Sequence, residues 1–398
     1  MRVRLTVGSL LLMLLGWCGH VTAAEPDASP LDPHQAYQAR RLDPVTYEVD
    51  FTVVVTAPYH TKKLKVWLPL PTTDAAQEVK GSKLTTFPTR VEPQIGTEPV
   101  FGNRFAYFEF DHPQGGQLIR HRFQVKVWEL RWDIDPQKVQ AVDEWPTAFA
   151  PYLRGEGQAV VVNEGVTQLL DKIVPQRTSG YQDLSTVMQW VDSNFIYDHG
   201  KSSLQASSVH ALETRRGHCS DYHGFCAAMG RALGYPARVT YGINPFPKNS
   251  PSHCKLEVFL PPYGWVSFDV SETQKLAALI REDGSLSDES RQELLRSASR
   301  RLLSGYRDNT WFLQTRGSDY DLVPAASQKV AVIRTIYAEA DGEPLPEPDP
   351  AAADQREFSW MTIHKYVPDR EIVYPFKNWS RLASPSQANP PAVDADHQ

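Results

Sequence analysis

Three short segments of the sequence carry side chains that together could break and form amide bonds. Cys219 follows Gly217 and His218, His253 opens an alternating apolar segment, and Asp269 closes the next such segment. A thiol, an imidazole and a carboxylate are the groups of a Cys-His-Asp acyl-transfer site, in which the thiolate attacks a carbonyl carbon and the imidazole moves protons. The sequence therefore predicts that Cys219, His253 and Asp269 are catalytic.

The nucleophile needs an element that lowers its pKa, and the sequence offers a helix. Apolar residues recur at helical spacing from Cys219 to Leu233, where a glycine and a proline follow as stop signals. Upstream, residues 209–216 predict a shorter helix with Gly217 in the left-handed position that ends it. A helix N-terminus and a nearby imidazolium lower a thiol pKa from ~8.5 to roughly 3.5–7.5. We therefore expect Cys219 to rest as a thiolate.

Strands should position the other two groups. Because side chains alternate between the faces of a strand, His253 and Lys255 share one face. Asp269 can then approach His253 from an adjacent antiparallel strand, accept a hydrogen bond from one ring nitrogen and leave the other for the sulfur. The alternating segments that predict these strands are residues 237–243, 254–260 and 265–270.

These segments resemble the core of the transglutaminase-like superfamily, whose fold is related to that of papain-like cysteine peptidases. The similarity covers about residues 144–342. It implies an α+β core in which the Cys-helix packs on an antiparallel sheet. The motifs that carry it are Gly217-His218-Cys219, Gly234-Tyr235-Pro236-Ala237-Arg238, His253 to Val258 and Gly264 to Asp269.

One position departs from the family pattern. The family often has Trp two residues after the His, whereas this chain has Lys255. If Lys255 lines the cleft beside His253, it binds substrate and favours acidic acyl donors. The alternative is that its long side chain reaches solvent along the strand edge and contacts nothing.

The cysteines and histidines allow a second interpretation. Cys219, His223 and Cys226 share one helix face and could bind zinc together with His253 and Cys254. The spacing lacks a CxxC clip and leaves Asp269 without a role, so we expect neither a metal nor another cofactor. In an oxidising compartment Cys226 and Cys254 could form a disulfide. We expect both to be buried free thiols, because Cys254 should face away from the Cys-helix if His253 faces it.

Composition narrows the partners, and the first residues indicate export. The chain has 398 residues and a net charge of −6, without a run of Lys and Arg. These features argue against nucleic acid and favour a protein or peptide substrate. Arginines, an apolar stretch and small residues over 1–24 predict a cleaved signal peptide, hence a periplasmic or extracellular location without a stable membrane anchor after cleavage.

The remaining chain divides by its punctuation into a linker (25–44), an immunoglobulin-like β-sandwich (45–135), the catalytic domain (140–345) and a partly disordered extension rich in Pro, Asp and Ala (346–398). Residues 330–338 predict a late strand that completes the catalytic sheet. For the oxyanion donor, Trp190, Phe195, Tyr197 and a backbone amide beside Cys219 remain open.

Taken together, these features predict an exported, cysteine-dependent enzyme that acts on peptide or glutamine amide bonds. Its thioester could be released by water, as in a protease or amidase, or by an amine, as in a transglutaminase. The same triad serves both reactions, so the sequence leaves that choice open. The alternative from another class is a catalytically inactive binding or scaffold protein that kept the fold.

Overall fold

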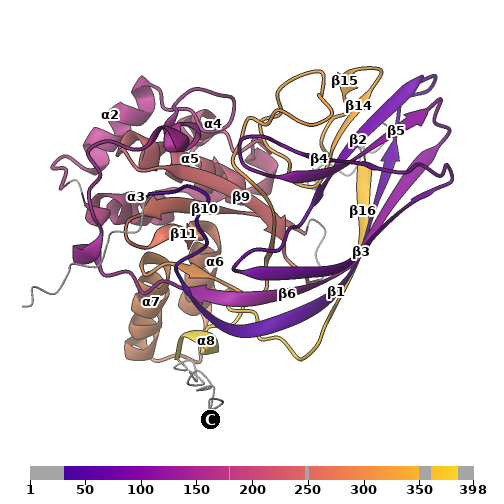
Figure 1. Cartoon of the computed structure of the whole chain (residues 1–398). Helices are drawn as coiled ribbons and strands as arrows, with labels where there is room; N and C mark the ends of the chain where they lie inside the picture. Colours follow the sequence, from indigo (N-terminus) through magenta and orange to yellow (C-terminus); the bar gives the residue numbers. More distant parts are fainter. Residues whose placement is uncertain (1–30, 179, 247–250, 349–359, 384–398) are drawn as a thin grey trace, which may run out of the picture. The chain divides into compact units, whose positions relative to one another are not determined.

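A β-sandwich takes its strands from both ends of the described chain. The computed structural model describes residues 31–178, 180–246, 251–348 and 360–383. The sheet that we call the outer sheet has the order β12-β6-β1-β16, with β3 also paired to β6, and the facing sheet has the order β15-β14-β2-β5-β4 (Figure 1). The outer-sheet strands are β1 (Arg40–Thr56), β3 (Gln77–Phe87), β6 (Gly116–Arg131), β12 (Tyr306–Arg307) and β16 (Trp360–Pro368). The facing-sheet strands are β2 (Lys63–Leu70), β4 (Gln94–Thr97), β5 (Arg104–Asp111), β14 (Tyr337–Ala340) and β15 (Glu343–Pro344).

Alternating β-branched and aromatic residues explain why these segments form a sandwich. Along β1, the side chains of Val49, Phe51 and Val53 are buried, and the residues between them are less so. Residues of these types fit a pleated, half-buried surface. They pack with inward side chains of β2, β5 and β6 in one apolar cluster. The predicted α+β class with an N-terminal antiparallel sandwich is confirmed.

Two strands near the carboxy terminus, β14 and β16, differ from the prediction. The predicted late strand over residues 330–338 does not join the catalytic sheet, because β14 pairs instead with β2 of the sandwich, Tyr337 opposite Trp67. Within the predicted extension, β16 pairs with β1 along its whole length, from Tyr47 opposite Pro368 to Val55 opposite Trp360. Sandwich and core are therefore not consecutive in sequence. The core is inserted between β6 and β14, and β12 inside that insertion returns to pair with β6.

The predicted linker is also corrected over its described part. Residues 31–39 run across the core instead of hanging free, and β1 already begins at Arg40. Tyr37 donates a hydrogen bond from its hydroxyl to Glu257 Oε1 at 2.7 Å, and Trp265 Nε1 donates to the carbonyl of Pro33 at 2.8 Å. Paired donors and acceptors of this kind hold the segment in place. The predicted signal peptide and the end of the chain from residue 384 lie outside the described residues.

A four-stranded antiparallel sheet of order β11-β10-β9-β13 forms the centre of the catalytic core, and helices pack on it (Figure 1). Its strands are β9 (Ala237–Ile243), β10 (Ser252–Leu260), β11 (Gly264–Phe268) and β13 (Phe312–Arg316). The helices around it are α1 (Ala150–Leu153), α2 (Glu164–Ile173), α3 (Tyr181–Asn194), α4 (Ser208–Thr214), α5 (Cys219–Ala232), α6 (Val270–Glu282) and α7 (Asp288–Leu303). Two further short elements are the parallel pair β7 (Ile196–Tyr197) and β8 (Arg216–Gly217), and α8 (Ser380–Ala383) lies near the end.

Two local details bear on the site. The predicted helix before the nucleophile ends two residues early, at Thr214, because Arg215, not Gly217, adopts the left-handed conformation with φ 51°. Gly217 instead pairs in β8, where an added Cβ would lie 2.3 Å from Asp221 Oδ2, so only glycine fits.

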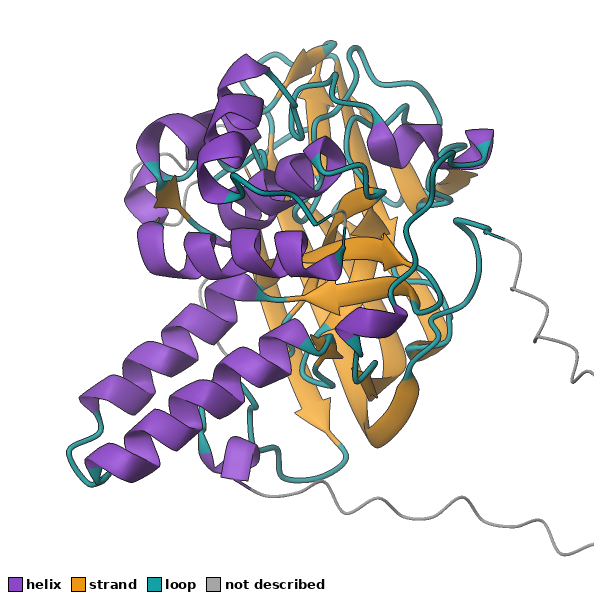
Figure 2. Cartoon of the chain, turned by 90° about the vertical axis from the view of Figure 1, so that its left-hand side faces the viewer, coloured by secondary structure: helices purple, strands orange, loops and turns teal. Residues whose placement is uncertain are grey.

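Figure 2 shows the long helices α6 and α7 side by side, joined through their own small apolar cluster. Among the described helices, none has the length and apolar character needed to cross a membrane.

Candidate active site

The thiol of Cys219 lies at the start of α5, where the sequence predicts it. His218 is the N-cap residue, and its backbone N–H donates to Asp221 Oδ2 at 3.1 Å in a capping box that fixes where the helix begins. Asp221 also accepts from the backbone N–H of Ser203 at 3.3 Å. The first turn is thus held from both sides, and the sulfur sits at the positive end of a buried helix.

The structure brings the three predicted catalytic residues together. His253 Nε2 lies 2.7 Å from Asp269 Oδ2, which leaves Nδ1 for its hydrogen bond with Cys219. The strands β10 and β11 that carry His253 and precede Asp269 are antiparallel neighbours, with Leu256 opposite Phe268. The sulfur also accepts the backbone N–H of Cys254 at 3.5 Å. All three side chains are buried, and Cys219 keeps 7% of its surface exposed.

Electrostatics in this site favours an ion pair between sulfur and imidazole. Burial raises the pKa of the Cys219 thiol, but the charge of His253 and its hydrogen bond outweigh burial and lower the pKa to about 5. Burial lowers the pKa of His253, but Asp269 and the thiolate outweigh it and raise the pKa to about 9. Between these values the sulfur is a thiolate and the ring an imidazolium, which is the reactive form of such a pair.

The reactivity of Cys219 should therefore follow a defined pH window. We expect its alkylation by iodoacetamide to rise as the pH passes about 5, where the thiolate forms. Amide turnover should rise over the same range and fall as the pH passes about 9, because His253 then loses the proton that the leaving amine needs. The measurement is the alkylation rate by mass spectrometry at each pH. A thiol that titrates at its ordinary value near ~8.5 would rule out the ion pair.

His223 and Cys226 belong to the packing around the triad. Burial lowers the pKa of His223 to about 3, so its ring is neutral, and its Nε2 accepts the backbone N–H of Val270 at 3.1 Å. That bond fixes the start of α6 beside Asp269. Burial raises the pKa of Cys226, which keeps it a thiol. Within the described ranges, no three His, Cys, Asp or Glu side chains gather in a geometry that could hold a metal ion.

The prediction of buried, free thiols at Cys226 and Cys254 is confirmed, although its reason was wrong. Both side chains are buried and unbridged. Cys254 does not face away from the Cys-helix, because it packs in the same apolar cluster as Cys226 and Phe225 of α5. Alternation along β10 places Cys254, Leu256 and Val258 in that cluster, whereas His253 and Lys255 contact Asp269.

Lys255 is the predicted site residue that the structure moves to another role. Only 1% of it is exposed, so it neither lines an open cleft nor reaches solvent. Its Nζ lies 2.6 Å from Asp269 Oδ2 and 2.9 Å from Asp308 Oδ1. The expected preference for acidic substrates through Lys255 is therefore wrong, because two carboxylates already neutralise the ammonium. Side chains alternate along a strand, so Lys255 lies on the same face as His253 and hence near Asp269. This alternation was the sequence signal that could have predicted the contact of Lys255 with Asp269. Nothing in the sequence pointed to Asp308.

Further polar groups surround the sulfur. The phenol of Tyr197 has its pKa raised by burial and by the charge of Cys219, so it stays protonated within electrostatic reach of the thiolate. The ammonium of Lys275 lies 3.6 Å from the centre of the Tyr197 ring. Trp190 and Phe195 instead pack their rings against Phe225. Of the three predicted aromatic residues, Tyr197 is thus the one whose side chain feels the charge of Cys219. An oxyanion donor at the helix start stays a prediction.

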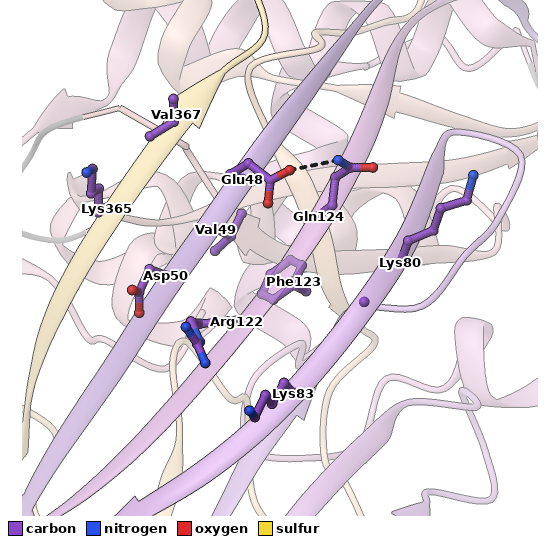
Figure 3. Close-up of a pocket in the computed structure, with 11 residues that line it drawn as sticks. Glu48, Val49, Asp50, Lys80, Lys83, Arg122, Phe123, Gln124, Lys365 and Val367 are labelled. Carbon is purple, nitrogen blue, oxygen red and sulfur yellow. Dashed lines mark hydrogen bonds between the residues drawn. The ribbon is translucent and has the colours of Figure 1, made fainter.

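A separate hollow lies on the outer sheet of the sandwich (Figure 3). It has a volume of about 600 Å³ and is lined by residues of β1, β3, β6 and β16. Glu48 in this hollow accepts a hydrogen bond from Gln124 at 2.7 Å. None of the triad residues lines this hollow, so it is separate from the candidate active site.

Comparison with known proteins identifies the core. Residues 167–270, which include Cys219, His253 and Asp269, match the model of the transglutaminase-like superfamily. This chain therefore contains a transglutaminase-like core domain, as its motifs predict. An uncharacterized protein of Haemophilus influenzae is 25% identical over 228 residues, which are 50% of this chain and 58% of that protein. The chain thus matches less than two thirds of that relative's length.

A solved structure shares the fold at larger scale. The crystal structure of a candidate cysteine protease from Cytophaga hutchinsonii superposes with a TM-score of 0.56 at 14% identity, and the alignment covers 84% of this chain and 94% of that one. At this identity the likeness concerns the fold. It extends well beyond the core domain, so the arrangement of sandwich and core is shared between the two proteins.

Proposed function

We propose that this protein is an exported cysteine-dependent acyl-transfer enzyme that attacks amide bonds of peptides or of glutamine side chains through Cys219. The observation that carries the proposal is the buried contact of His253 with both Asp269 and Cys219, which favours a thiolate–imidazolium pair. Transglutaminase-like domains are typically those of cysteine-dependent enzymes. Export and a periplasmic or extracellular location rest on the sequence of residues 1–24.

The first half of the reaction makes a thioester. Cys219 Sγ attacks the carbonyl carbon, and the negative charge moves to the carbonyl oxygen, where the N-terminal end of α5 and the Tyr197 hydroxyl are the available donors. The carbon–nitrogen bond then breaks, and the leaving nitrogen takes the proton from His253 Nδ1. Asp269 stays ionised and holds Nε2–H throughout, which keeps the ring oriented.

The second half frees the acyl group. Water or an amine gives its proton to His253 Nδ1 while its oxygen or nitrogen attacks the thioester carbon, and Cys219 leaves as a thiolate. Water as acceptor yields a carboxylic acid, and an amine yields a new amide. Both outcomes return the imidazolium and the thiolate to their starting state, so the same three residues serve either reaction.

Trapping of the acyl-enzyme tests this proposal. The purified chain is incubated with a glutamine-containing peptide and a biotinylated primary amine, and intact mass spectrometry follows the protein while chromatography follows the peptide. We expect a hydroxylamine-sensitive adduct on Cys219. Shortened peptide indicates peptide hydrolysis, glutamate indicates deamidation, and biotinylated peptide indicates transamidation. Absence of adduct and of every product, over a panel of peptides, would favour the inactive binding protein instead.

A further inference from the structure

A buried ion pair, formed by Lys255 and Asp308, contacts the triad residue Asp269. Lys255 Nζ bridges Asp269 Oδ2 and Asp308 Oδ1 at 2.6 and 2.9 Å, and all three side chains are at most 1% exposed. The oxygen of Asp269 that Lys255 contacts is the one that accepts from His253 at 2.7 Å. One carboxylate oxygen is therefore shared between an imidazole and an ammonium.

Lys255 is enclosed by side chains and does not reach solvent. Its Nζ lies 5.4 Å from the ring centre of Trp311 and 5.2 Å from that of Phe376, so aromatic rings close the space around it. Thr310 donates its hydroxyl to the second oxygen of Asp308. Burial disfavours the charged form of Lys255, but Asp269 and Asp308 outweigh burial and raise its pKa, which keeps it an ammonium.

We propose that Lys255 and Asp308 are positioning residues of the triad: through Lys255 they fix the carboxylate of Asp269 against His253 and set how much of its charge the imidazole feels. This inference rests on the proposed function, but it concerns residues outside the three that carry the chemistry. Lys255 and His253 donate to Oδ2 of Asp269, and the backbone N–H of Glu272 donates to Oδ1 at 3.0 Å, so contacts at both oxygens hold the carboxylate against the ring.

The role of Asp308 follows from charge. A lone ammonium on Asp269 would compete with the imidazolium for the same negative charge and weaken its hold on His253. Asp308 draws the ammonium to its other side and offsets that competition. Together with Asp269 and the imidazolium, the pair makes two cations and two anions in a buried row, which lowers the cost of burying each charge. The family that these segments resemble often has Trp at the position where this chain has Lys255.

Other titratable groups also face this row. They are Tyr47 of β1, His223 of α5, Cys254 of β10, Glu272 of α6, Arg301 of α7 and Tyr306 of β12. Besides His253, those that interact with the charge of Cys219 itself are His218, Tyr197, Tyr241, Cys254, Lys275 and Arg334. Each of these groups is unchanged in the variants below, so a shift between variants reports the Lys255–Asp308 pair.

The test compares variants whose pH profiles should separate. In Asp308→Asn the ammonium pairs with Asp269 alone, so the pKa of His253 should fall and the alkaline limb of the pH–rate profile should move down by about one unit. In Lys255→Met and in the double variant Lys255→Met/Asp308→Asn, Asp269 serves His253 alone, and the limb should move up or stay at its original position. We also expect kcat to fall roughly ten- to hundred-fold in the double variant with little change in KM, because neither residue touches substrate.

A matched control and a second readout keep the test decisive. Glu257 lies on the same strand, is equally buried and pairs with Arg238 at 2.7 Å, so Glu257→Gln should leave the limb in place. Iodoacetamide alkylation of Cys219 and the NMR titration of His253 give the same pKa values without any substrate. If these titrations do not differ between Asp308→Asn and the double variant, the inference is wrong even where turnover confirms the enzyme. If the titrations shift but no variant or wild type turns over amides, the proposed function fails and the positioning role stands.

Discussion

Replacing Cys219 with alanine should abolish amide turnover, by roughly 10⁴-fold or more, while the protein stays folded. The reason is that the sulfur is the atom that attacks, and no other described thiol has its environment. Burial raises the pKa of both Cys226 and Cys254. The measurement is product formation from the peptide panel, with circular dichroism and the thermal midpoint as checks of the fold.

The other two buried thiols are the matched controls for this variant. Cys226→Ala and Cys254→Ala each remove a sulfur of similar size from the same apolar cluster, at a cost of about 1 kcal/mol in stability. Cys254 contacts the nucleophile through its backbone N–H, which alanine retains. Both controls should keep most of their activity. Turnover in Cys219→Ala at the level of these controls would place the chemistry on another residue.

Exchange of Asp269 for asparagine should slow acyl transfer by roughly 10²- to 10⁴-fold with the fold retained. Its Oδ2 now accepts from His253 Nε2 and from Lys255 Nζ, and both partners are donors. An amide group turned toward them puts a third donor there, so the imidazole must change its tautomer or turn away. Its Oδ1 caps α6 by accepting the backbone N–H of Glu272 at 3.0 Å, and asparagine caps a helix equally well.

The pH dependence identifies the cause of that loss. Without the carboxylate, His253 loses a main cause of its raised pKa, so the alkaline limb should move down from about 9 toward the ordinary value of imidazole. Ser271→Ala is the control, since its hydroxyl donates to Oδ1 at 3.2 Å, on the side away from the ring, and should alter turnover less than about threefold. An Asp269→Asn variant with unchanged rate and unchanged limb would show that Asp269 is only the cap of α6.

Local patterns were enough to predict the elements that hold the triad. The helix that begins at Cys219 and the strand over Ala237–Ile243 occur where spacing and alternation indicate them, because cap, stop signal and periodicity all act within a few residues. The contact of His253 with Asp269 followed from the same period of two. These are features that the chain encodes close to where they appear.

Features that depend on distant pairing were not predictable in this way. The pairing of β16 with β1 joins residues that are hundreds of positions apart, and an alternating segment does not state which sheet it joins. Asp308 sits in a short connection after β12 and gains its role only because the fold brings it to Lys255. A buried lysine also looks like any surface lysine in a sequence, since its burial depends on partners from elsewhere.

The insertion of the core between β6 and β14 has a consequence for folding. When the sandwich forms, Arg131 of β6 pairs with Tyr306 of β12 and closes a loop of about 175 residues that contains Cys219, His253 and Asp269. Closing a loop of that length costs roughly 5 kcal/mol of chain entropy by the usual logarithmic relation. Once the sandwich has met that cost, the core starts its own folding with its ends already fixed. The sandwich then holds the two ends of the core together. The strand β16, which is synthesised last, completes the outer sheet by pairing with β1.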